Sequence, residues 1–307
     1  MGFDNIIGQE KVKKRLNFFL EGQAKSRLSP HILFSAARGS GKTLIAQTYA
    51  DQLINSEGKI RRRMTINCSS IKTLKRFVND ILAAHVIGKE ITILFDEASE
   101  IPEDMTMALL TILNPNQQNS NSFSYDDLTI DFDFKNVTFL FATTEAHKIN
   151  PALMDRLERV DLEQYSIENL SAIVQKNSAA NITDVAIEQI SKVLRGNARK
   201  ATQMANHIAL YLSTKNKQTF DIDDWKEFCS NMGINPLGLS PMEIRVLQCL
   251  AEKSETTLTN LSAKTHMTRE SLQRDIEMYL QKTNLMEVTP TGRKLTHAGR
   301  HYLENLK

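Results

Sequence analysis

The sequence has few of the residues that build disulfide-linked, metal-linked or membrane-spanning proteins. Only three of its 307 residues are cysteines, Cys68, Cys229 and Cys249, and none of them forms a C-x-x-C pair. This spacing excludes a disulfide framework and predicts a reduced, cytoplasmic protein. The seven histidines show no H-E-x-x-H or other paired ligand spacing, so no metal site of that kind is expected. No apolar run is long enough to cross a bilayer, so no membrane association is expected.

An excess of charge of one sign is also absent. The 38 Lys and Arg residues nearly balance the 36 Asp and Glu residues, which leaves a net charge of +2. A nucleic-acid partner would therefore have to be bound by a local patch. The first residues lack the apolar segment of a secretory signal. The length favours two or three domains, and the 41% hydrophobic content is ordinary for a globular protein.

Three short apolar runs predict buried strands at residues 31–35, 90–97 and 137–144. Segments with helical spacing lie between them, and continuous apolar strands are typical of a parallel sheet covered on both faces. The alternation predicts an α/β domain at residues 1–161. Residues 162–235 read as four helices and predict an all-α domain. Three helices and two short strands around "TPTGRK" predict a winged helix at residues 236–307.

Residues 35–43, "SAARGSGKT", nearly match the phosphate-loop pattern G-x-x-x-x-G-K-[ST], with Ala36 in place of the first glycine. Such a loop wraps backbone N–H groups around phosphates at the start of a helix. Lys42 would neutralise the β- and γ-phosphates, and Thr43 would bind Mg²⁺. Alanine costs little at Ala36 if its φ is negative. The alternative is an inert turn, but we predict an ATP site that also includes Arg38, Gly39, Ser40, Gly41 and Leu44.

A second motif supports this interpretation. Asp96 and Glu97 end the predicted strand at 90–97, 54 residues after Lys42. Ligands of parallel sheets bind at the carboxyl ends of the strands. We expect Asp96 to hold Mg²⁺ through water and Glu97 to orient the attacking water. The alternative is a pair of solvated acids at a strand end.

Taken in order, "IIGQ", "HILFSAARGSGKT", "ITILFDEASEI", "FLFATT", "NPALMDRLERV" and "RGNARKATQMANHI" resemble an AAA+ ATPase. The details, including the closing "TPTGRKLT", resemble the RuvB family of Holliday-junction branch-migration motors over nearly the whole chain. The resemblance implies an AAA+ large domain, a helical lid and a winged helix. It also implies a homo-oligomer, usually a hexamer, that uses ATP to move duplex DNA.

The resemblance assigns roles that the residues alone do not reveal. Arg156 matches the arginine finger that reaches the ATP of the neighbouring subunit, and Arg199 matches sensor 2 on the lid. Without the resemblance both are ordinary surface arginines. The other matches are Ile6 and Ile7 near the adenine and the sensor-1 pair Thr143 and Thr144, of which Thr144 is the expected catalytic residue.

Several positions depart from the family pattern. Besides Ala36, the residues after Glu97 are Ala98, Ser99 and Glu100, where the family usually has a histidine and an arginine. Met154 replaces an arginine, and Ala198 replaces a proline. None of these changes removes a primary catalytic group, so a divergent member is expected.

The segment at about 114–136 corresponds to a β-hairpin that in this family docks onto RuvA, the protein that holds the junction. "LTIDF" alternates as a strand does, and "NQQNSNS" is expected to be the polar tip. The expected partner contacts are Phe123, Tyr125, Leu128 and Ile130. The alternative is that these side chains pack on the domain's own sheet.

In the last domain, Arg293, Lys294 and Arg300 lie close together with no acidic residue between them. On a wing they would contact phosphates of duplex DNA without reading its sequence, and such binding weakens steeply with salt. The alternative is a solvated hairpin. The basic run "KIRRRM" at 59–64 is instead expected to flank a strand and face solvent.

Two other functions remain open at this point. The chain could be an ATP-dependent switch, such as a replication initiator or a clamp-loader-like protein, which uses ATP to hold an assembled state. It could also be an inactive scaffold, although Lys42, Asp96, Glu97 and Arg156 are all present. The hairpin segment and the wing favour the motor.

Overall fold

The computed structural model describes residues 2–306. The chain divides into two compact units, Met1–Asp221 and Ile222–Lys307, which are described separately. Within residues 2–306, no helix combines the length and apolar character that crossing a membrane requires.

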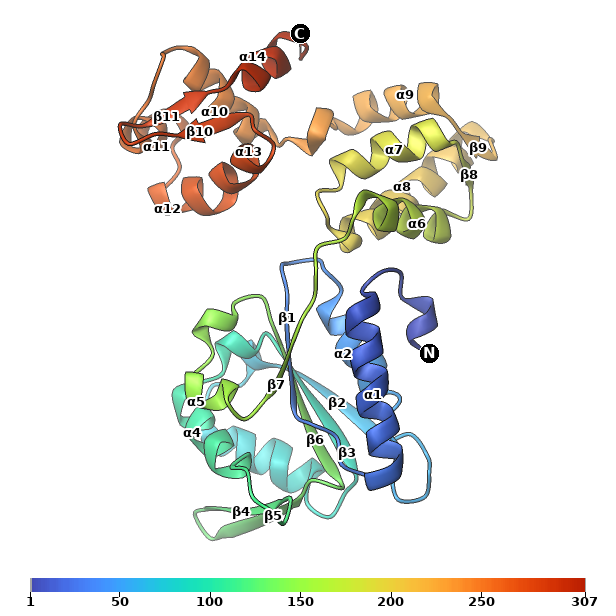
Figure 1. The fold of residues 1–307 in the computed structure, drawn as a ribbon, viewed down its shortest axis with the longest axis vertical. Coiled ribbons are helices and arrows are strands. Elements are labelled where there is room, and N and C mark those ends of the chain that lie inside the picture. Colours follow the sequence, from blue (N-terminus) through green and yellow to red (C-terminus); the bar gives the residue numbers. More distant parts are fainter. Residues whose placement is uncertain (1, 307) are drawn as a thin grey trace. The chain divides into compact units, whose positions relative to one another are not determined.

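The first unit is built on a five-stranded parallel sheet with strand order β2-β3-β6-β1-β7 (Figure 1). The strands are β1 (Ile32–Ser35), β2 (Arg62–Asn67), β3 (Ile91–Asp96), β6 (Val137–Thr143) and β7 (Glu158–Asp161). The three strands expected from apolar runs are confirmed and form the centre of the sheet. Of the two edge strands, β2 is the strand expected beside the basic run at 59–64, but it includes part of that run. The other, β7, was not expected, because its side chains are mostly polar and only partly covered.

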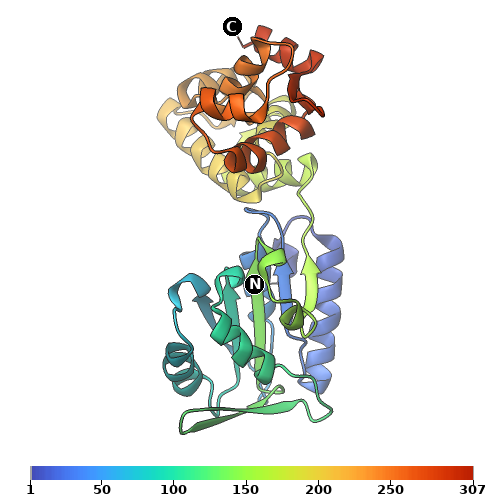
Figure 2. The same ribbon diagram turned by 90° about the vertical axis from the view of Figure 1, so that its left-hand side faces the viewer.

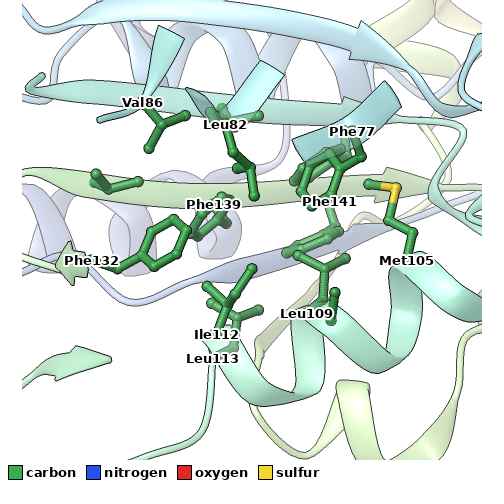
Figure 3. Packing of buried hydrophobic residues seen from close by; sticks show 14 of the residues in the cluster. Phe77, Leu82, Val86, Met105, Leu109, Ile112, Leu113, Phe132, Phe139 and Phe141 are labelled. Atoms are coloured by element: carbon green, nitrogen blue, oxygen red, sulfur yellow. The ribbon is translucent and has the colours of Figure 1, made fainter. Parts of the chain in front are cut away.

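Helices cover both faces of this sheet (Figures 1 and 2). One face packs against α1 (Glu10–Ser26) and α2 (Lys42–Ala50). The other packs against α3 (Leu74–Arg76), the π-helical segment η3 (Phe77–Ala83) and α4 (Glu103–Ile112). Figure 3 shows Phe139 and Phe141 of β6 among side chains from η3 and α4. Alternate residues of each central strand pack on the two faces, which explains why these strands are apolar along most of their length.

The expected hairpin is present as β4 (Ser120–Tyr125) and β5 (Leu128–Asp133), which pair antiparallel. Its turn is at Asp126 and Asp127, so the prediction that "NQQNSNS" forms the tip is wrong; that segment leads into β4.

The apolar side chains of this hairpin turn toward its own domain. Phe123 and Ile130 pair across the hairpin and are buried in the core that includes Phe132. They are not available as partner contacts, so the alternative holds for both. Tyr125 and Leu128 pair beside the turn and are only partly buried.

The basic run at 59–64 is not wholly solvent-facing. Arg61 is buried, with an exposed fraction of 2%. Its guanidinium donates to the carbonyls of Ile54, Arg27 and Lys135 and to the hydroxyl of Thr138. These bonds compensate for burial of the charge. They also link the connection before β2 to the segments at the amino ends of β1 and β6. The arginine is therefore a structural residue.

Short elements complete the sheet domain: the 3-10 turns η1 (Phe3–Asn5), η2 (Cys68–Ser70), η4 (Ala98–Glu100) and η5 (Ala146–Lys148), and the helix α5 (Pro151–Met154). The rest of the first unit is helical, with α6 (Ile167–Ser178), α7 (Asp184–Val193) and α8 (Ala198–Lys215). Two-residue strands β8 (Asn181–Ile182) and β9 (Thr219–Phe220) pair in parallel. Ser166 caps α6 and Asn197 caps α8, each by accepting a backbone N–H bond in the first turn.

The second unit begins with α9 (Ile222–Met232) and contains the expected winged helix. Its elements are η6 (Pro236–Gly238), α10 (Pro241–Ala251), α11 (Leu258–Thr265), α12 (Arg269–Ser271), η7 (Leu272–Glu277), α13 (Met278–Lys282), β10 (Met286–Val288), β11 (Arg293–Leu295) and α14 (His297–Glu304). The two strands pair antiparallel and form the wing. The last helix, α14, was not expected. Tyr302, on α14, packs in the core of this domain, so the helix closes it.

Candidate nucleotide site

The phosphate loop joins the end of β1 to the start of α2. Gly39 and Gly41 both have φ of +81°, in the left-handed region that glycine adopts without strain. Ala36 lies outside that region, so its methyl group causes no backbone strain. The loop thus has the backbone shape that presents N–H groups to a phosphate at a helix N-terminus. The expectation that alanine is tolerated at position 36 is confirmed in this respect.

Lys42, Thr43 and Asp96 meet at the carboxyl edge of the sheet. The hydroxyl of Thr43 donates to the carboxylate of Asp96, at 3.1 Å from Oδ2 and 3.3 Å from Oδ1. The backbone N–H of Glu97 donates to Asp96 Oδ1 at 3.1 Å. A hydroxyl and a carboxylate in contact form an all-oxygen donor set, which is the kind that Mg²⁺ prefers. These residues therefore fit the metal that the fold implies.

Lys42 is buried near the carboxylates of Asp96 and Glu97, with an exposed fraction of 9%. Its Nζ lies 3.5 Å from the carbonyl of Ala37, inside the loop. Burial lowers the pKa of Lys42, the charge of Arg199 lowers it further, and the carboxylates of Asp96 and Glu97 oppose the shift. A phosphate in the loop would place further negative charge close to this ammonium group and stabilise its protonated form.

The catalytic candidates Glu97 and Thr144 lie at the same edge. Glu97 directly follows β3, is exposed, and has φ of +56°, so the chain turns sharply after Asp96. Thr144 directly follows the adjacent strand β6 and is exposed, whereas Thr143 is buried and its hydroxyl accepts the N–H of Glu145. The register pairs Asp96 with Ala142, two residues before Thr144. The sheet thus brings both exposed side chains to the neighbourhood of the loop.

The N-terminal segment packs in the core that also includes residues of α2, the helix that follows the loop. Ile6 is buried in the core beneath α1 and α2, and Ile7 is half-buried. Sequence reasoning missed Tyr165, which is buried here. A Cβ added to Gly8 would lie 3.2 Å from the Tyr165 ring, and one added to Gly41 would lie 3.3 Å from its hydroxyl. Tyr165 therefore joins the N-terminal segment to the phosphate loop.

The helical part of the first unit also contacts the loop. The N–H of Arg199 donates to the Gly39 carbonyl, and Asn197 Nδ2 donates to the Arg38 carbonyl, both at 3.3 Å. A Cβ on Gly39 would lie 2.2 Å from Asn197 Oδ1, so only glycine fits there. Asn197, which the sequence reasoning also missed, thus caps α8 and touches the loop at once. The arrangement couples the position of α8 to the conformation of the phosphate loop.

Arg156 lies away from this loop, just after α5. Its Nη1 donates to the carbonyl of Ala152 at 2.6 Å, and its Nη2 donates to Asn114 Oδ1 at 3.3 Å. The side chain is half-buried, and it lines a surface hollow with Asn114, Pro115 and Leu157. Within residues 2–306, therefore, the contacts of Arg156 do not include the phosphate loop of its own chain.

The wing differs from the sequence expectation at one residue. Arg293 forms a two-point ion pair with Glu277, with 2.7 Å between Nε and Oε1 and 3.1 Å between Nη2 and Oε2. Both side chains are largely buried, with exposed fractions of 13% for Arg293 and 5% for Glu277. The guanidinium therefore anchors the wing to η7 and is not free to contact phosphate. Lys294, half-exposed and paired with Glu287, and Arg300, exposed on α14, remain at the surface.

Comparison with known families agrees with both halves of this arrangement. Residues 32–165 match the "ATPase family associated with various cellular activities (AAA)". Residues 236–304 match the "RuvB C-terminal winged helix domain". The chain thus combines an AAA ATPase domain with a RuvB-type winged helix domain.

RuvB relatives match along almost the entire chain. The RuvB subunit of the Holliday junction branch migration complex of Mycoplasmopsis pulmonis is 26% identical, over 99% of this chain and 96% of the relative. That of Campylobacter lari is 27% identical, over 95% and 86%. Among solved structures, the Thermotoga maritima RuvB Holliday junction branch migration motor shares the fold with a TM-score of 0.77 and 20% identity, covering 99% of this chain and 97% of the other.

Proposed function

We propose that this chain is an ATP-driven motor that moves duplex DNA through Holliday junctions. The observation that carries the proposal is the presence, on one chain, of an assembled phosphate-loop site and a RuvB-type winged helix. The curated relatives, matched over most of their length, are named as subunits of the branch migration complex. Three parts would share the work: the sheet domain, the helical lid and the winged helix.

The chemistry of hydrolysis is assigned to residues at one edge of the sheet. Thr43 and Asp96 would hold Mg²⁺, which when bound neutralises charge on the phosphate oxygens. Lys42 would bind the β- and γ-phosphates, and Glu97 would orient the attacking water. Thr144 would contact the γ-phosphate or that water. These assignments are supported by position, because the loop, β3 and β6 all bring their side chains to this edge of the sheet.

Two assignments concern movement and assembly. The lid contact through Asn197 and Arg199 would sense whether the loop holds a triphosphate, because it bonds directly to the carbonyls of Arg38 and Gly39. Arg156 makes its contacts outside its own phosphate loop. We infer that it serves the site of a neighbouring subunit in a ring, and the family resemblance implies that this ring is a hexamer.

The partner-binding surface is proposed to be smaller than the sequence suggested. Because Phe123 and Ile130 are buried, the hairpin offers Tyr125 and Leu128, beside the turn at Asp126 and Asp127. A RuvA-type junction-binding protein is the proposed partner for this end of the hairpin.

A branch-migration assay tests the proposed function. With ATP and Mg²⁺, the purified chain should convert a labelled synthetic four-way junction into duplex products, and a RuvA-type partner should increase the rate. Lys42→Ala should abolish conversion, because the loop would lose the cation that binds the phosphates. The products are measured by gel electrophoresis. Tight junction binding with a single round of hydrolysis and no conversion would instead indicate an ATP-dependent switch.

DNA contacts are proposed for Lys294 and Arg300, but not for Arg293. Each phosphate contact contributes about −0.9 to the slope of log affinity against log salt concentration. Lys294→Ala and Arg300→Ala should therefore each make the slope shallower by about that amount. Duplex binding measured by fluorescence anisotropy over a salt series gives the slope. Lys226→Ala, which removes a cation paired with Asp223 on α9, is the control and should leave the slope unchanged.

A further inference from the structure

The guanidinium of Arg156 is held on one side by its own subunit. The Ala152 carbonyl takes one hydrogen of Nη1, and Asn114 Oδ1 takes one hydrogen of Nη2. Because the guanidinium is planar and rigid, a bond at each of its two terminal nitrogens restricts both its position and its plane. Each of these two nitrogens has a second hydrogen that neither bond uses, so the group keeps donors for a phosphate.

The hold on Arg156 is incomplete within its own chain. Among residues 2–306, its Nε is a buried nitrogen without a hydrogen-bond partner. A buried donor left unpaired costs free energy, so Ala152 and Asn114 do not satisfy the side chain fully.

Asn114 is itself fixed by the base of the hairpin. Asn121, on β4, donates through Nδ2 to the carbonyl of Asn114 at 2.7 Å and to the carbonyl of Ile112 at 2.8 Å. Asn116 donates in turn to Asn121 Oδ1 at 2.6 Å. These bonds connect the end of α4 to the first hairpin strand. Asn114 therefore lies between the hairpin and Arg156, with its backbone bonded to one and its side chain bonded to the other.

We propose that Asn114 is a positioning residue that orients Arg156 for the ATP of the neighbouring subunit. The inference rests on the proposed function, in which Arg156 acts in trans. In this role the side-chain oxygen of Asn114 contacts no nucleotide. Instead it sets the angle of the guanidinium plane, and the hairpin base sets the position of Asn114. A partner bound at the hairpin turn would reach the finger through this same chain of contacts.

A mixing experiment isolates this role. Arg156→Ala subunits keep their own ATP site but supply no finger, and Lys42→Ala subunits supply a finger but cannot hydrolyse. A mixture of the two should therefore recover ATPase activity. When the donor is Lys42→Ala/Asn114→Ala, we expect the recovered kcat to fall by about tenfold or more, because a misplaced catalytic group loses much of its effect. KM for ATP should be unchanged, because the hydrolysing subunits are the same in both mixtures.

Matched donors separate positioning from general damage. Lys42→Ala/Gln117→Ala shortens an exposed side chain of the same loop, outside the bonds that fix Asn114 and Arg156, and should support normal recovery. Lys42→Ala/Asn114→Asp keeps an acceptor oxygen in place and should restore most of the activity. Rates are expressed per assembled oligomer, measured by sedimentation. If the alanine donor does not assemble, Asn114→Gln, which moves the acceptor by one methylene group, replaces it with the same expected loss.

The outcomes are distinguishable. Recovery with the Asn114→Ala donor equal to that with Lys42→Ala alone overturns the role of Asn114 and leaves the finger assignment intact. A change in KM with kcat unchanged overturns it as well. No recovery in the reference mixture of Arg156→Ala and Lys42→Ala overturns the trans finger itself, and the inference about Asn114 with it.

Discussion

Glu97→Gln should bind ATP as the native chain does and hydrolyse it at least about a hundredfold more slowly, since a positioned general base contributes roughly 10² to 10⁴ in rate. The glutamine keeps the size of the side chain and removes the charge that would attract a proton from water. The backbone N–H of Glu97 bonds Asp96, and that bond does not depend on the side chain. The Thr43–Asp96 contact and the loop should therefore remain in place.

The measurement is a pair of titrations on the same preparation. ATP binding is followed by isothermal calorimetry, and hydrolysis is followed by phosphate release. Glu100→Gln is the matched control, because it neutralises an exposed acid three residues further on in η4 and should leave both quantities near the native values. If Glu97→Gln hydrolysed ATP at the native rate, the catalytic base would be another residue. If it lost ATP binding, Glu97 would be needed to shape the phosphate loop and not for the chemical step.

Sequence patterns revealed the central part of this site because its geometry is local. The phosphate loop needs glycine where φ is positive, at Gly39 and Gly41, and these requirements are met within a few residues. The adjacent acids were predictable because Asp96 ends a strand that is otherwise almost entirely apolar. Apolar runs of this kind identified the three central strands. The edge strand β7 was missed and β2 was expected without bounds, since partly exposed edge strands have no continuous apolar run.

The residues that surround the loop could not be predicted in the same way. Tyr165 and Asn197 approach Gly41 and Gly39 only because the chain folds back after β7, more than a hundred residues later. A single aromatic residue between the last strand and the first lid helix was the available signal for Tyr165. For Asn197 the signal was its place just before a predicted helix, which indicates a cap but not a loop contact.

Charge and apolarity alone also misled the sequence reasoning at two surfaces. Arg293 was expected to face DNA, yet Glu277, sixteen residues earlier, binds it in the interior of the winged helix. Removing one partner of such a buried pair typically costs about 3–5 kcal/mol, so the pair belongs to the fold. Phe123 and Ile130 were expected to face a partner, but the same alternation that makes a strand also turns one face toward the protein's own core.

Arg156→Ala should reduce the ATPase rate of the assembled protein by about 10³ or more, the contribution of a trans arginine to phosphoryl transfer. Charge develops on the γ-phosphate oxygens during the reaction, and the guanidinium neutralises it only at that stage. ATP binding should be nearly unchanged, because Lys42 and the loop of each subunit remain intact. The loss should thus be seen in kcat and not in the affinity for ATP.

Arg159→Ala is the matched control for this variant. Arg159 lies three residues further on, is exposed, and pairs with Asp161 on β7, so its removal should leave kcat within about twofold, as for most exposed ion pairs.

Steady-state phosphate release at several protein concentrations shows whether Arg156 acts in trans or within its own subunit. If the finger acts in trans, the native specific activity rises with concentration as subunits assemble, and Arg156→Ala removes that rise. A native chain that remains monomeric with ATP and duplex DNA, and an Arg156→Ala variant with the same turnover, would together contradict a shared site. The ATP would then be hydrolysed by one subunit alone, and the contacts of Arg156 with Ala152 and Asn114 would be purely structural.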